Sequence, residues 1–334
     1  MIRFSLVVFL LLSSCSDSSI QRETVLDEIV TIHDEIVYDV PDVLRWCDRL
    51  GFEGEKINIG NARLYVETEG EGIPLVLLHG GPGGTHHYFH PHFSRAAEFA
   101  KVIYYDQRGC GLSDYEPGKG YTIEQAVNDL ENLRMALDLD EWVVLGHSYG
   151  GILAQEYAIT YPDNLAGLVL VGTATSLNIE LEPTRQYDFI CEEEIARLQE
   201  INRMSDLSME QLLYNRFLNG DWKRQSYYRP SEERIAEIAR YEWVHDPDFR
   251  SQLCRSMHDL DLEGAFQNFR IPTLIIEGEW DLTWNTDKPG VIQSQHPNAE
   301  MIILEHAGHD TYEDDPETFF SELERFFSRL GVRQ

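Results

Sequence analysis

Short apolar runs that alternate with helical patterns constrain the fold of this chain more than any other feature. The clearest helical pattern covers 122–139, where Ile123, Val127, Leu130 and Leu137 recur on one face. Strands that alternate with helices favour a mostly parallel sheet covered by helices on both faces, so we predict an α/β fold. The continuous apolar runs of strand length are 74–78, 102–105, 142–145, 168–171, 273–276 and 301–304.

Two further segments complete the predicted architecture. Residues 56–59 and 63–66 alternate between apolar and polar side chains and flank Gly60-Asn61, which predicts a hairpin. Between 174 and 264 the strand runs stop, and Glu, Arg, Tyr and Leu recur at helical spacing. We therefore predict a core made of 55–173 and 265–334, with 174–264 as a helical cap over the carboxyl edge of the sheet.

The charge of the chain excludes one class of partner. Its 334 residues hold 27 Lys and Arg against 58 Asp and Glu, for a formal net charge of −31. So negative a surface repels phosphate backbones, so we expect no nucleic-acid partner. It would attract cationic groups, such as the free amino terminus of a peptide.

The first residues read as a targeting segment. A basic start at Arg3 precedes the apolar run 4–12, which is shorter than the roughly 20 residues that span a bilayer. The run ends in Leu12-Ser13-Ser14-Cys15, which resembles the lipobox of bacterial lipoproteins. We predict a signal peptide at 1–14, lipidation of Cys15 and an acidic extension at 15–54. The protein would then be exported and membrane-anchored on the periplasmic or outer-surface side, the alternative being an ordinary cleaved signal.

Four cysteines lie beyond Cys15. In an oxidising compartment Cys191 could pair with Cys254, or Cys47 with either of them, and the sequence does not select among these pairings. Cys110 lies in a glycine-flanked loop, where we expect a free thiol.

The sharpest chemical motif is Gly146-His147-Ser148-Tyr149-Gly150. It follows the predicted strand 142–145 and precedes a helical run at 152–161. This is the strand–turn–helix setting of the G-x-S-x-G turn, in which small neighbours let the serine hydroxyl project above the sheet. Ser148 is therefore the candidate nucleophile.

A serine nucleophile needs a base and an acid that orients the base, and in this setting both follow the serine along the chain. Asp281 follows the predicted strand 273–276, with Glu277 and Glu279 as nearby alternatives. The loop after 168–171 carries no carboxylate, which favours Asp281. After the last strand, His309 is favoured over His306 because Ala307-Gly308 lets the loop approach the serine.

Backbone donors for a developing oxyanion are expected at two places. The glycine-rich segment 79–84 follows the predicted strand 75–78, and Gly81 N–H is the expected donor there. The second donor is Tyr149 N–H, directly after the serine. The segment lacks the G-K-[ST] ending of a phosphate loop.

The histidines at 86, 87, 90 and 92 could suggest a metal site. No Cys or carboxylate in that stretch completes the set, and a serine hydrolase needs no metal. We therefore predict neither a metal nor a cofactor.

Three motifs carry a resemblance to a known family. His79-Gly80-Gly81-Pro82-Gly83-Gly84, Asp106-Gln107-Arg108-Gly109-Cys110-Gly111-Leu112-Ser113 and the Ser148 turn together resemble the proline iminopeptidase (prolyl aminopeptidase) family of α/β-hydrolases. The resemblance runs from about residue 56 to the end and weakens in the cap. It implies release of an amino-terminal proline, or another small residue, from short peptides through a triad of Ser148, Asp281 and His309.

The resemblance also implies that carboxylates of the cap hold the substrate's amino group. The segment 239–242 is similar to one that supplies such a group, so Glu242 is the candidate, with Asp248 and Asp246 as second choices. Leu282 stands where some relatives carry a further glutamate. The alternative is a carboxylesterase, amidase or lactonase with the same triad. A third hypothesis is a non-catalytic binding protein on this scaffold. A small peptide or ester is the expected partner.

Overall fold

The computed structural model describes residues 33, 35–116, 121–174, 192–257, 260, 262, 264–283 and 288–330. The predicted signal peptide at 1–14, Cys15 and Cys191 lie outside this part of the chain. Within it, no helix is both long and apolar enough to cross a membrane.

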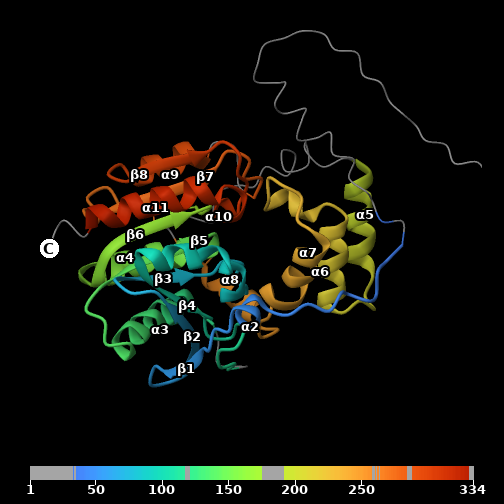
Figure 1. Ribbon diagram of the computed structural model, residues 1–334, viewed down its shortest axis with the longest axis horizontal. Helices are drawn as coiled ribbons and strands as arrows, with labels where there is room; N and C mark the ends of the chain where they lie inside the picture. The colour runs from blue at the N-terminus through green and yellow to red at the C-terminus, as the bar shows by residue number, and fades with distance from the viewer. Residues whose placement is uncertain are drawn as a thin grey trace, which may run out of the picture.

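Eight strands form one sheet in the order β1-β2-β4-β3-β5-β6-β7-β8 (Figure 1). β1 and β2 form the predicted antiparallel hairpin, β2 is also antiparallel to β4, and every later pairing is parallel. The predicted α/β fold with a mostly parallel sheet is confirmed. The strands are β1 Glu55–Asn58, β2 Arg63–Glu69, β3 Ile73–Leu78, β4 Ala100–Tyr105, β5 Trp142–His147, β6 Leu165–Val171, β7 Thr273–Gly278 and β8 Glu300–Leu304.

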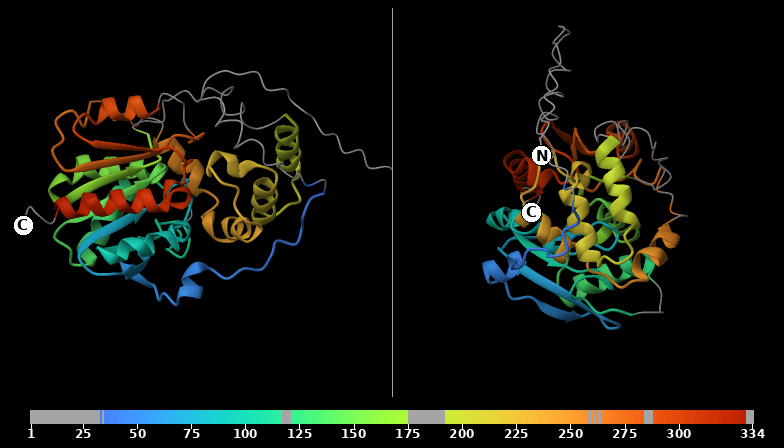
Figure 2. Two further views of the ribbon diagram at one scale, coloured as in Figure 1. Left: turned by 45° about the horizontal axis from the view of Figure 1, so that its top comes forward. Right: turned by 90° about the vertical axis from the view of Figure 1, so that its right-hand side faces the viewer.

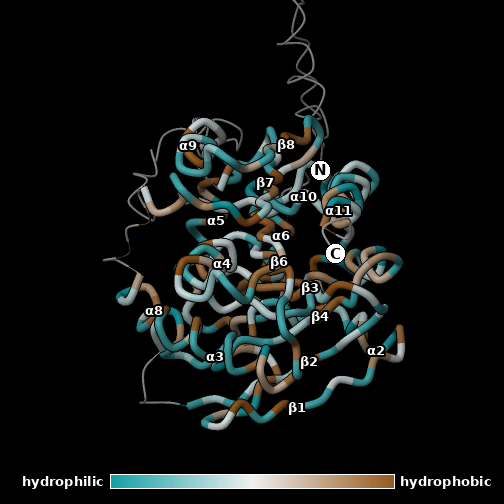
Figure 3. Tube along the Cα trace, turned by 90° about the vertical axis from the view of Figure 1, so that its left-hand side faces the viewer, coloured by the Kyte–Doolittle hydropathy of each residue, from teal (hydrophilic) through white to brown (hydrophobic). Residues whose placement is uncertain are grey.

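The central strands are buried on both faces, which is why they read as continuous apolar runs. In β3, Val76 and Leu78 belong to one core cluster, whereas Leu75 and Leu77 belong to another on the opposite face. Figure 3 shows the hydrophobic stretches gathered along these strands. The inner strands therefore have no polar face, and their sequences lack the alternation of apolar and polar residues that marks a strand with one exposed face.

Helices cover both faces of the sheet (Figure 2). One core cluster includes residues of α3 (Ile123–Ala136), α4 (Tyr149–Thr160), α8 (Phe249–Met257) and α9 (Lys288–Gln295). The other includes residues of α11 (Pro316–Leu330), where Phe319, Leu323 and Phe326 recur at helical spacing on the buried face. The short helices η1 (His86–Phe89), η2 (His92–Glu98) and α10 (Thr311–Asp314) join this second face, and η3 (Pro162–Asn164) precedes β6.

A second group of helices lies beyond one end of the sheet (Figure 1). Leu213, Phe217, Trp222 and Ile235 of this group bury one another in a separate apolar cluster. α8 packs with the sheet instead, through Phe249, Leu253 and Met257. The group comprises α5 (Glu192–Arg203), α6 (Met209–Leu218), η4 (Asp221–Arg224), α7 (Glu232–Glu237) and the π-helical turn η5 (Ile238–Glu242), and we keep the name cap for it.

Residues 35–45, here called the N-terminal strap, cross the cap before α2 (Trp46–Leu50) leads into β1 (Figure 2). Val37 N–H donates to Asn215 Oδ1 at 2.8 Å, and Asn215 Nδ2 donates back to Val37 O at 2.7 Å. Tyr241 OH donates to Val43 O at 2.6 Å. The strap thus joins α6 and η5 of the cap to the core, an arrangement that the sequence did not predict.

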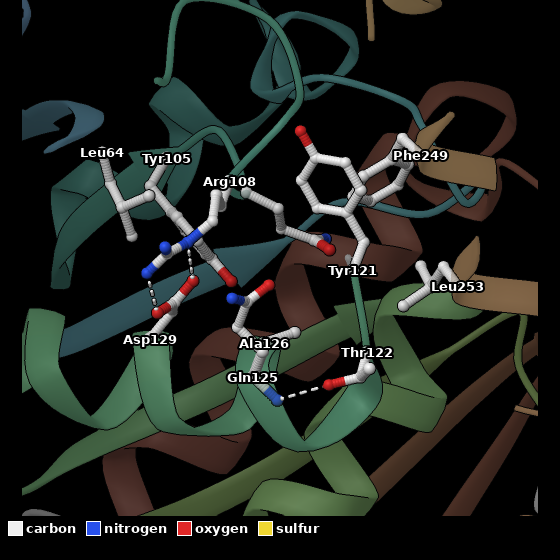
Figure 4. Close-up of a pocket in the computed structure, with 11 residues that line it drawn as sticks. Leu64, Tyr105, Arg108, Tyr121, Thr122, Gln125, Ala126, Asp129, Phe249 and Leu253 are labelled. Carbon is white, nitrogen blue, oxygen red and sulfur yellow. Dashed lines mark hydrogen bonds and ion pairs between the residues drawn. The ribbon is translucent and has the colours of Figure 1, made fainter. Parts of the chain in front are cut away.

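The loop that begins at Asp106 is a structural junction. Arg108 is buried and forms two bonds with Asp129 of α3, Nε to Oδ2 at 2.7 Å and Nη2 to Oδ1 at 2.6 Å. Its Nη2 also donates to Asn61 Oδ1 at 2.7 Å. Figure 4 shows this pair beside a cavity of about 10 Å³, near the minimum for one water molecule. The cavity is therefore a packing gap, and Arg108 joins the hairpin, the loop and α3.

Replacing this arginine tests that role. Arg108→Met should lower the free energy of unfolding by about 3–5 kcal/mol, because it leaves the Asp129 carboxylate buried without its cation. Urea titration followed by circular dichroism measures the change. Arg95→Met is the control, since its partner Glu317 lies at the surface, and it should shift the midpoint far less. Equal shifts would contradict the structural role of Arg108.

Candidate active site

Ser148 occupies a strained turn between β5 and α4. Its φ of 57° and ψ of −126° lie in a region that side chains other than glycine rarely adopt. The turn also needs close backbone contacts, since a Cβ on Gly150 would lie 2.1 Å from Leu78 O and one on Gly146 would lie 2.2 Å from Gly150 O. Ser148 N–H donates to Val171 O at 2.9 Å, which ties the turn to β6. The glycines of the motif thus allow the turn that presents the serine.

The Ser148 side chain faces a pocket of about 310 Å³ between the carboxyl end of the sheet and the cap. The core contributes Gly81 and His309 to its lining, and the cap contributes Phe217 and Glu242. A volume of this order suits a ligand of one or two residues in size. Such crevices at the carboxyl ends of parallel strands are the usual ligand sites of open α/β sheets.

His309 and Asp281 meet at the edge of this pocket. His309 Nδ1 lies 2.8 Å from Asp281 Oδ2, and both side chains are at most 4% exposed. The second oxygen, Asp281 Oδ1, accepts a hydrogen bond from Thr283 N–H at 2.9 Å. The carboxylate is thereby fixed on one side by backbone and on the other by the imidazole, an arrangement that sets the tautomer and orientation of the ring.

The alternatives to these two residues lie elsewhere. His306 is exposed, and its ring packs against Tyr227 at 5.7 Å between centroids. Glu277 is buried at the end of β7, where Thr173 N–H donates to its Oε1 at 3.3 Å, and Glu279 is exposed. None of the three lines the Ser148 pocket.

The loop that carries His309 is held by hydrogen bonds from several directions. Gly308 N–H donates to Asp314 Oδ2 at 2.7 Å, and Asp310 N–H donates to Gln225 O at 3.0 Å. His147, the residue before Ser148, places its Nε2 at 3.1 Å from His309 O. The serine turn and the histidine loop are therefore mechanically joined.

The glycine-rich segment lies opposite the serine. Gly81 has a φ of +119°, and a Cβ there would lie 2.6 Å from Gly83 N, so only glycine fits this bend. Gly80 N–H donates to Tyr88 OH, and Gln107 Nε2 donates to His79 O at 2.8 Å. Tyr149 begins the 12-residue helix α4, whose N-terminus favours negative charge. Gly81 thus lines the same pocket as Ser148, and Tyr149 directly follows the serine at the start of α4.

Glu242 reaches the pocket from η5, but it already has a partner. It forms an ion pair with Arg234 of α7, whose Nη2 lies 2.9 Å from Glu313 Oε2. Burial raises the pKa of Glu242 to about 7, against the opposing effect of the Arg234 charge. Arg234 is therefore shared between two carboxylates, which leaves the group with one excess negative charge when both are ionised.

The second-choice acids do not reach this pocket. Asp248 is exposed at the start of α8, where its N–H donates to Asp246 Oδ1 at 2.9 Å. Asp246 is buried and accepts a hydrogen bond from Tyr121 OH at 3.0 Å. Neither lines the pocket, so the structure does not support Asp248 in substrate binding.

The pocket also contains charged residues that the sequence analysis missed. Arg216 and Asp221 form an ion pair of 2.5 Å at the cap side, and Arg224, Arg250 and Asp310 also line the pocket. Asp310 directly follows His309, and burial raises its pKa well above the usual range. The arginines belong to no motif, and only the packing of the cap and of α8 brings them to the pocket of Ser148.

The fold places a cysteine and a carboxylate beside the histidine cluster, which the sequence analysis did not predict. Cys47 of α2 and Glu67 of β2 lie beside His86 and His90, although no Cys or carboxylate is near those histidines in the sequence. Cys47 Sγ lies 3.6 Å from His86 Nε2.

Cys47, Cys110 and Cys254 are free thiols, so the structure shows neither a Cys47–Cys254 disulfide nor a disulfide at Cys110.

Known proteins share the sequence pattern and the fold of this chain. The profile of the alpha/beta hydrolase fold matches residues 73–316. A proline iminopeptidase of Lactobacillus delbrueckii subsp. bulgaricus is 38% identical over 271 residues, which cover 75% of this chain and 89% of the relative.

Solved structures show the same fold. An esterase from Exiguobacterium antarcticum superposes with a TM-score of 0.66 and 22% identity, over 83% of this chain and 98% of that one. A proline iminopeptidase from Mycobacterium smegmatis gives a TM-score of 0.64 and 21% identity, over 84% of this chain and 99% of that one. Fold and site thus define an α/β hydrolase. Within that class, the chain belongs to the proline iminopeptidase family.

Proposed function

We propose that this hydrolase is a serine aminopeptidase that releases an amino-terminal proline, or another small residue, from short peptides. The observation that carries the proposal is the 2.8 Å contact of His309 Nδ1 with Asp281 Oδ2 in a pocket that Ser148 also lines. A fixed imidazole leaves its Nε2 to act on a serine hydroxyl. Sequence identity to proline iminopeptidases supports the choice of substrate.

The proposed reaction passes through a covalent acyl-enzyme. Ser148 Oγ attacks the carbonyl carbon of the first residue, and its proton passes to His309 Nε2. Gly81 N–H and Tyr149 N–H donate to the oxyanion, with each such donor worth roughly 3 kcal/mol in the transition state. His309 gives the proton to the departing amine as the peptide bond breaks. Water, deprotonated by His309, then cleaves the ester and restores Ser148.

In this proposal Glu242 recognises the substrate's ammonium group. The carboxylate lines the pocket that Ser148 faces, so a bound ammonium could pair with it while the adjacent carbonyl lies at the serine. The excess negative charge of the Arg234, Glu242 and Glu313 group supports this role. The same contact would limit cleavage to one residue.

A carboxylesterase is the second candidate, and the Arg234–Glu242 pair favours it. A carboxylate that is already neutralised within the protein binds a cation more weakly than an unpaired one. The esterase with the same fold is consistent with this alternative. Turnover of a prolyl arylamide against a short acyl ester decides between them: we expect kcat/KM to favour the arylamide, and a strong preference for the ester would overturn the aminopeptidase proposal.

Substitution of Glu242 tests ammonium recognition. Glu242→Gln should raise KM for peptides with a free amino end about 10- to 100-fold, because a charge-assisted hydrogen bond contributes roughly 1.5–3 kcal/mol. KM for neutral esters should change little. Glu313→Gln is the matched control, because Glu313 also pairs with Arg234 but does not line the pocket. Equal effects of both variants on both substrates would remove the proposed role.

The raised pKa of Glu242 adds a pH dependence to this prediction. The carboxylate is ionised above about pH 7 and becomes neutral as the pH falls through that value. Ammonium binding should weaken in the same direction, so the KM ratio of peptide to ester should rise below pH 7 in the wild type and stay flat in Glu242→Gln. The acidic and basic groups near Glu242 are Arg234, Glu313, Glu237 and Asp310, with the Tyr88 and Tyr312 hydroxyls also nearby, and the ester measurement cancels their shared effects.

We also propose that the protein is exported and anchored through lipid on Cys15. The basic start and the apolar run 4–12 that ends at Cys15 support this proposal. Incorporation of labelled fatty acid into the wild type but not into Cys15→Ala would test it.

A further inference from the structure

Four buried side chains from three distant segments converge outside the substrate pocket. Cys47 belongs to α2, Glu67 to β2, His86 to η1, and His90 directly follows η1. Each is at most 3% exposed, and one potential ligand atom from each lies within 4.8 Å of all the others. None of the four lines the pocket of Ser148. The cluster is therefore separate from the proposed catalytic site.

Three distances in the cluster are close to those between neighbouring ligands of a tetrahedral metal ion. Around Zn²⁺ with ordinary bond lengths, sulfur and nitrogen ligands lie about 3.6 Å apart, and nitrogen and oxygen ligands lie about 3.3 Å apart. Cys47 Sγ lies 3.6 Å from His86 Nε2, and His86 Nε2 lies 3.4 Å from Glu67 Oε1. His90 Nε2 lies 3.1 Å from Glu67 Oε2. These three pairs thus have the spacing of ligands around one ion, with His86 and His90 facing different oxygens of Glu67, and one ligand atom from each residue lies within 4.8 Å of the others.

We propose that Cys47, Glu67, His86 and His90 bind one divalent transition-metal ion, with Zn²⁺ as the best match. Sulfur and imidazole ligands select against Ca²⁺ and Mg²⁺, which prefer oxygen. One thiolate, one carboxylate and two neutral imidazoles also balance the two charges of the ion. Four protein ligands and deep burial are the features of a structural site rather than a catalytic one.

Neighbouring side chains hold the ligands in place. His86 Nδ1 lies 2.8 Å from Asp106 Oδ1, which leaves Nε2 directed at the cluster. Tyr65 OH donates to Glu67 Oε1 at 2.7 Å. The His90 ring stacks on Tyr104 with 4.1 Å between centroids. A carboxylate behind a metal-bound histidine and a hydrogen-bonded carboxylate ligand are regular second-layer features of metal sites.

The other two histidines of the stretch do not take part. The His87 ring packs against Tyr241 of the cap at 5.1 Å between centroids. His92 Nε2 lies 3.9 Å from Glu313 Oε2. His86 and His90 are therefore the two histidines of this stretch that lie in the cluster, and the fold supplies the remaining ligands.

A bound ion would join the two segments that shape the active site. Cys47 follows the N-terminal strap, which is bonded to the cap. His86 and His90 flank Tyr88, whose hydroxyl accepts from Gly80 N–H of the glycine-rich segment. The metal would thus stabilise the position of the strap and of the proposed oxyanion donors without contacting the substrate.

Metal content of the full chain, produced without a polyhistidine tag, tests the proposal. After dialysis against metal-free buffer, the protein should retain about one Zn²⁺ per chain, measured by inductively coupled plasma mass spectrometry. Cys47→Ser and His90→Gln should lose it, whereas the matched controls Cys254→Ser and His92→Gln should keep it. Folded wild type that retains no metal after refolding with excess Zn²⁺ would overturn the proposal, as would equal retention in Cys47→Ser and Cys254→Ser.

Cobalt gives a second measurement if the Cys47 and His90 variants do not fold. Wild type refolded with Co²⁺ should show a sulfur-to-cobalt charge-transfer band and the intense visible bands of tetrahedral Co²⁺. The spectrum should persist in Cys110→Ser and Cys254→Ser. A spectrum without the charge-transfer band would exclude Cys47 as a ligand and contradict the site. These measurements are independent of hydrolysis, so the metal site and the aminopeptidase proposal stand or fall separately.

Discussion

Ser148→Ala should abolish hydrolysis, with kcat falling about 10⁶-fold, while the fold is retained. The reaction needs a covalent acyl-enzyme, and alanine offers no oxygen to form one. The turn itself should survive, because serine and alanine both carry a Cβ and meet the same strain at a φ of 57°. Turnover of a prolyl arylamide by purified variant, with circular dichroism as the check on folding, measures the effect.

A covalent probe adds the control for this variant. A fluorophosphonate should label the wild type and Ser251→Ala, an exposed serine of α8, but not Ser148→Ala. Labelling that persists in Ser148→Ala would assign the nucleophile elsewhere. A wild type that is folded but neither labelled nor active would favour the binding-protein reading of the scaffold.

Asp281→Asn should lower kcat about 10⁴-fold with little change in KM. The carboxylate lies 2.8 Å from His309 Nδ1, so it accepts a hydrogen bond from Nδ1–H and leaves Nε2 unprotonated and able to take the proton of the serine. An asparagine amide can instead donate to Nδ1, which moves the ring proton to Nε2 and removes the base. Steady-state kinetics on the same arylamide separate the loss in kcat from any effect on binding.

The neighbouring acid provides the comparison. Glu279→Gln alters an exposed carboxylate two residues before Asp281 and should leave kcat within about threefold of the wild type, as surface substitutions usually do. A larger loss in Glu279→Gln than in Asp281→Asn would show that the acid has been misassigned. Circular dichroism on both variants separates misfolding from lost chemistry.

The strands of the core could be predicted because a strand that is buried on both faces is apolar at successive positions. Every predicted run, from 74–78 to 301–304, lies on a strand of the sheet. The helix predicted at 122–139 is α3, which begins where Thr122 Oγ1 accepts from Gln125 N–H at 3.1 Å. The order β4-β3-β5 was not predicted, because periodicity carries no information about which strands pair.

The candidate site also contains residues that local patterns predict and residues that they do not. Ser148, Gly81 and Asp281 each follow a strand, and the carboxyl ends of parallel strands meet at one edge, so their approach follows from local patterns. The cap residues have no such anchor. Glu242 was proposed from resemblance alone, its partner Arg234 was not predicted, and Asp248 lies away from the pocket.

The sequence by itself determined the α/β class, the serine turn and the segments that bear the candidate acid and base, since each depends on short-range geometry and on local burial. Only the tertiary structure decided what the strap and cap do. It brought Arg234 to Glu242, and it brought Cys47 and Glu67 to His86 and His90. These residues are far apart in the sequence and become neighbours only when the chain folds. Local sequence patterns therefore cannot predict these contacts.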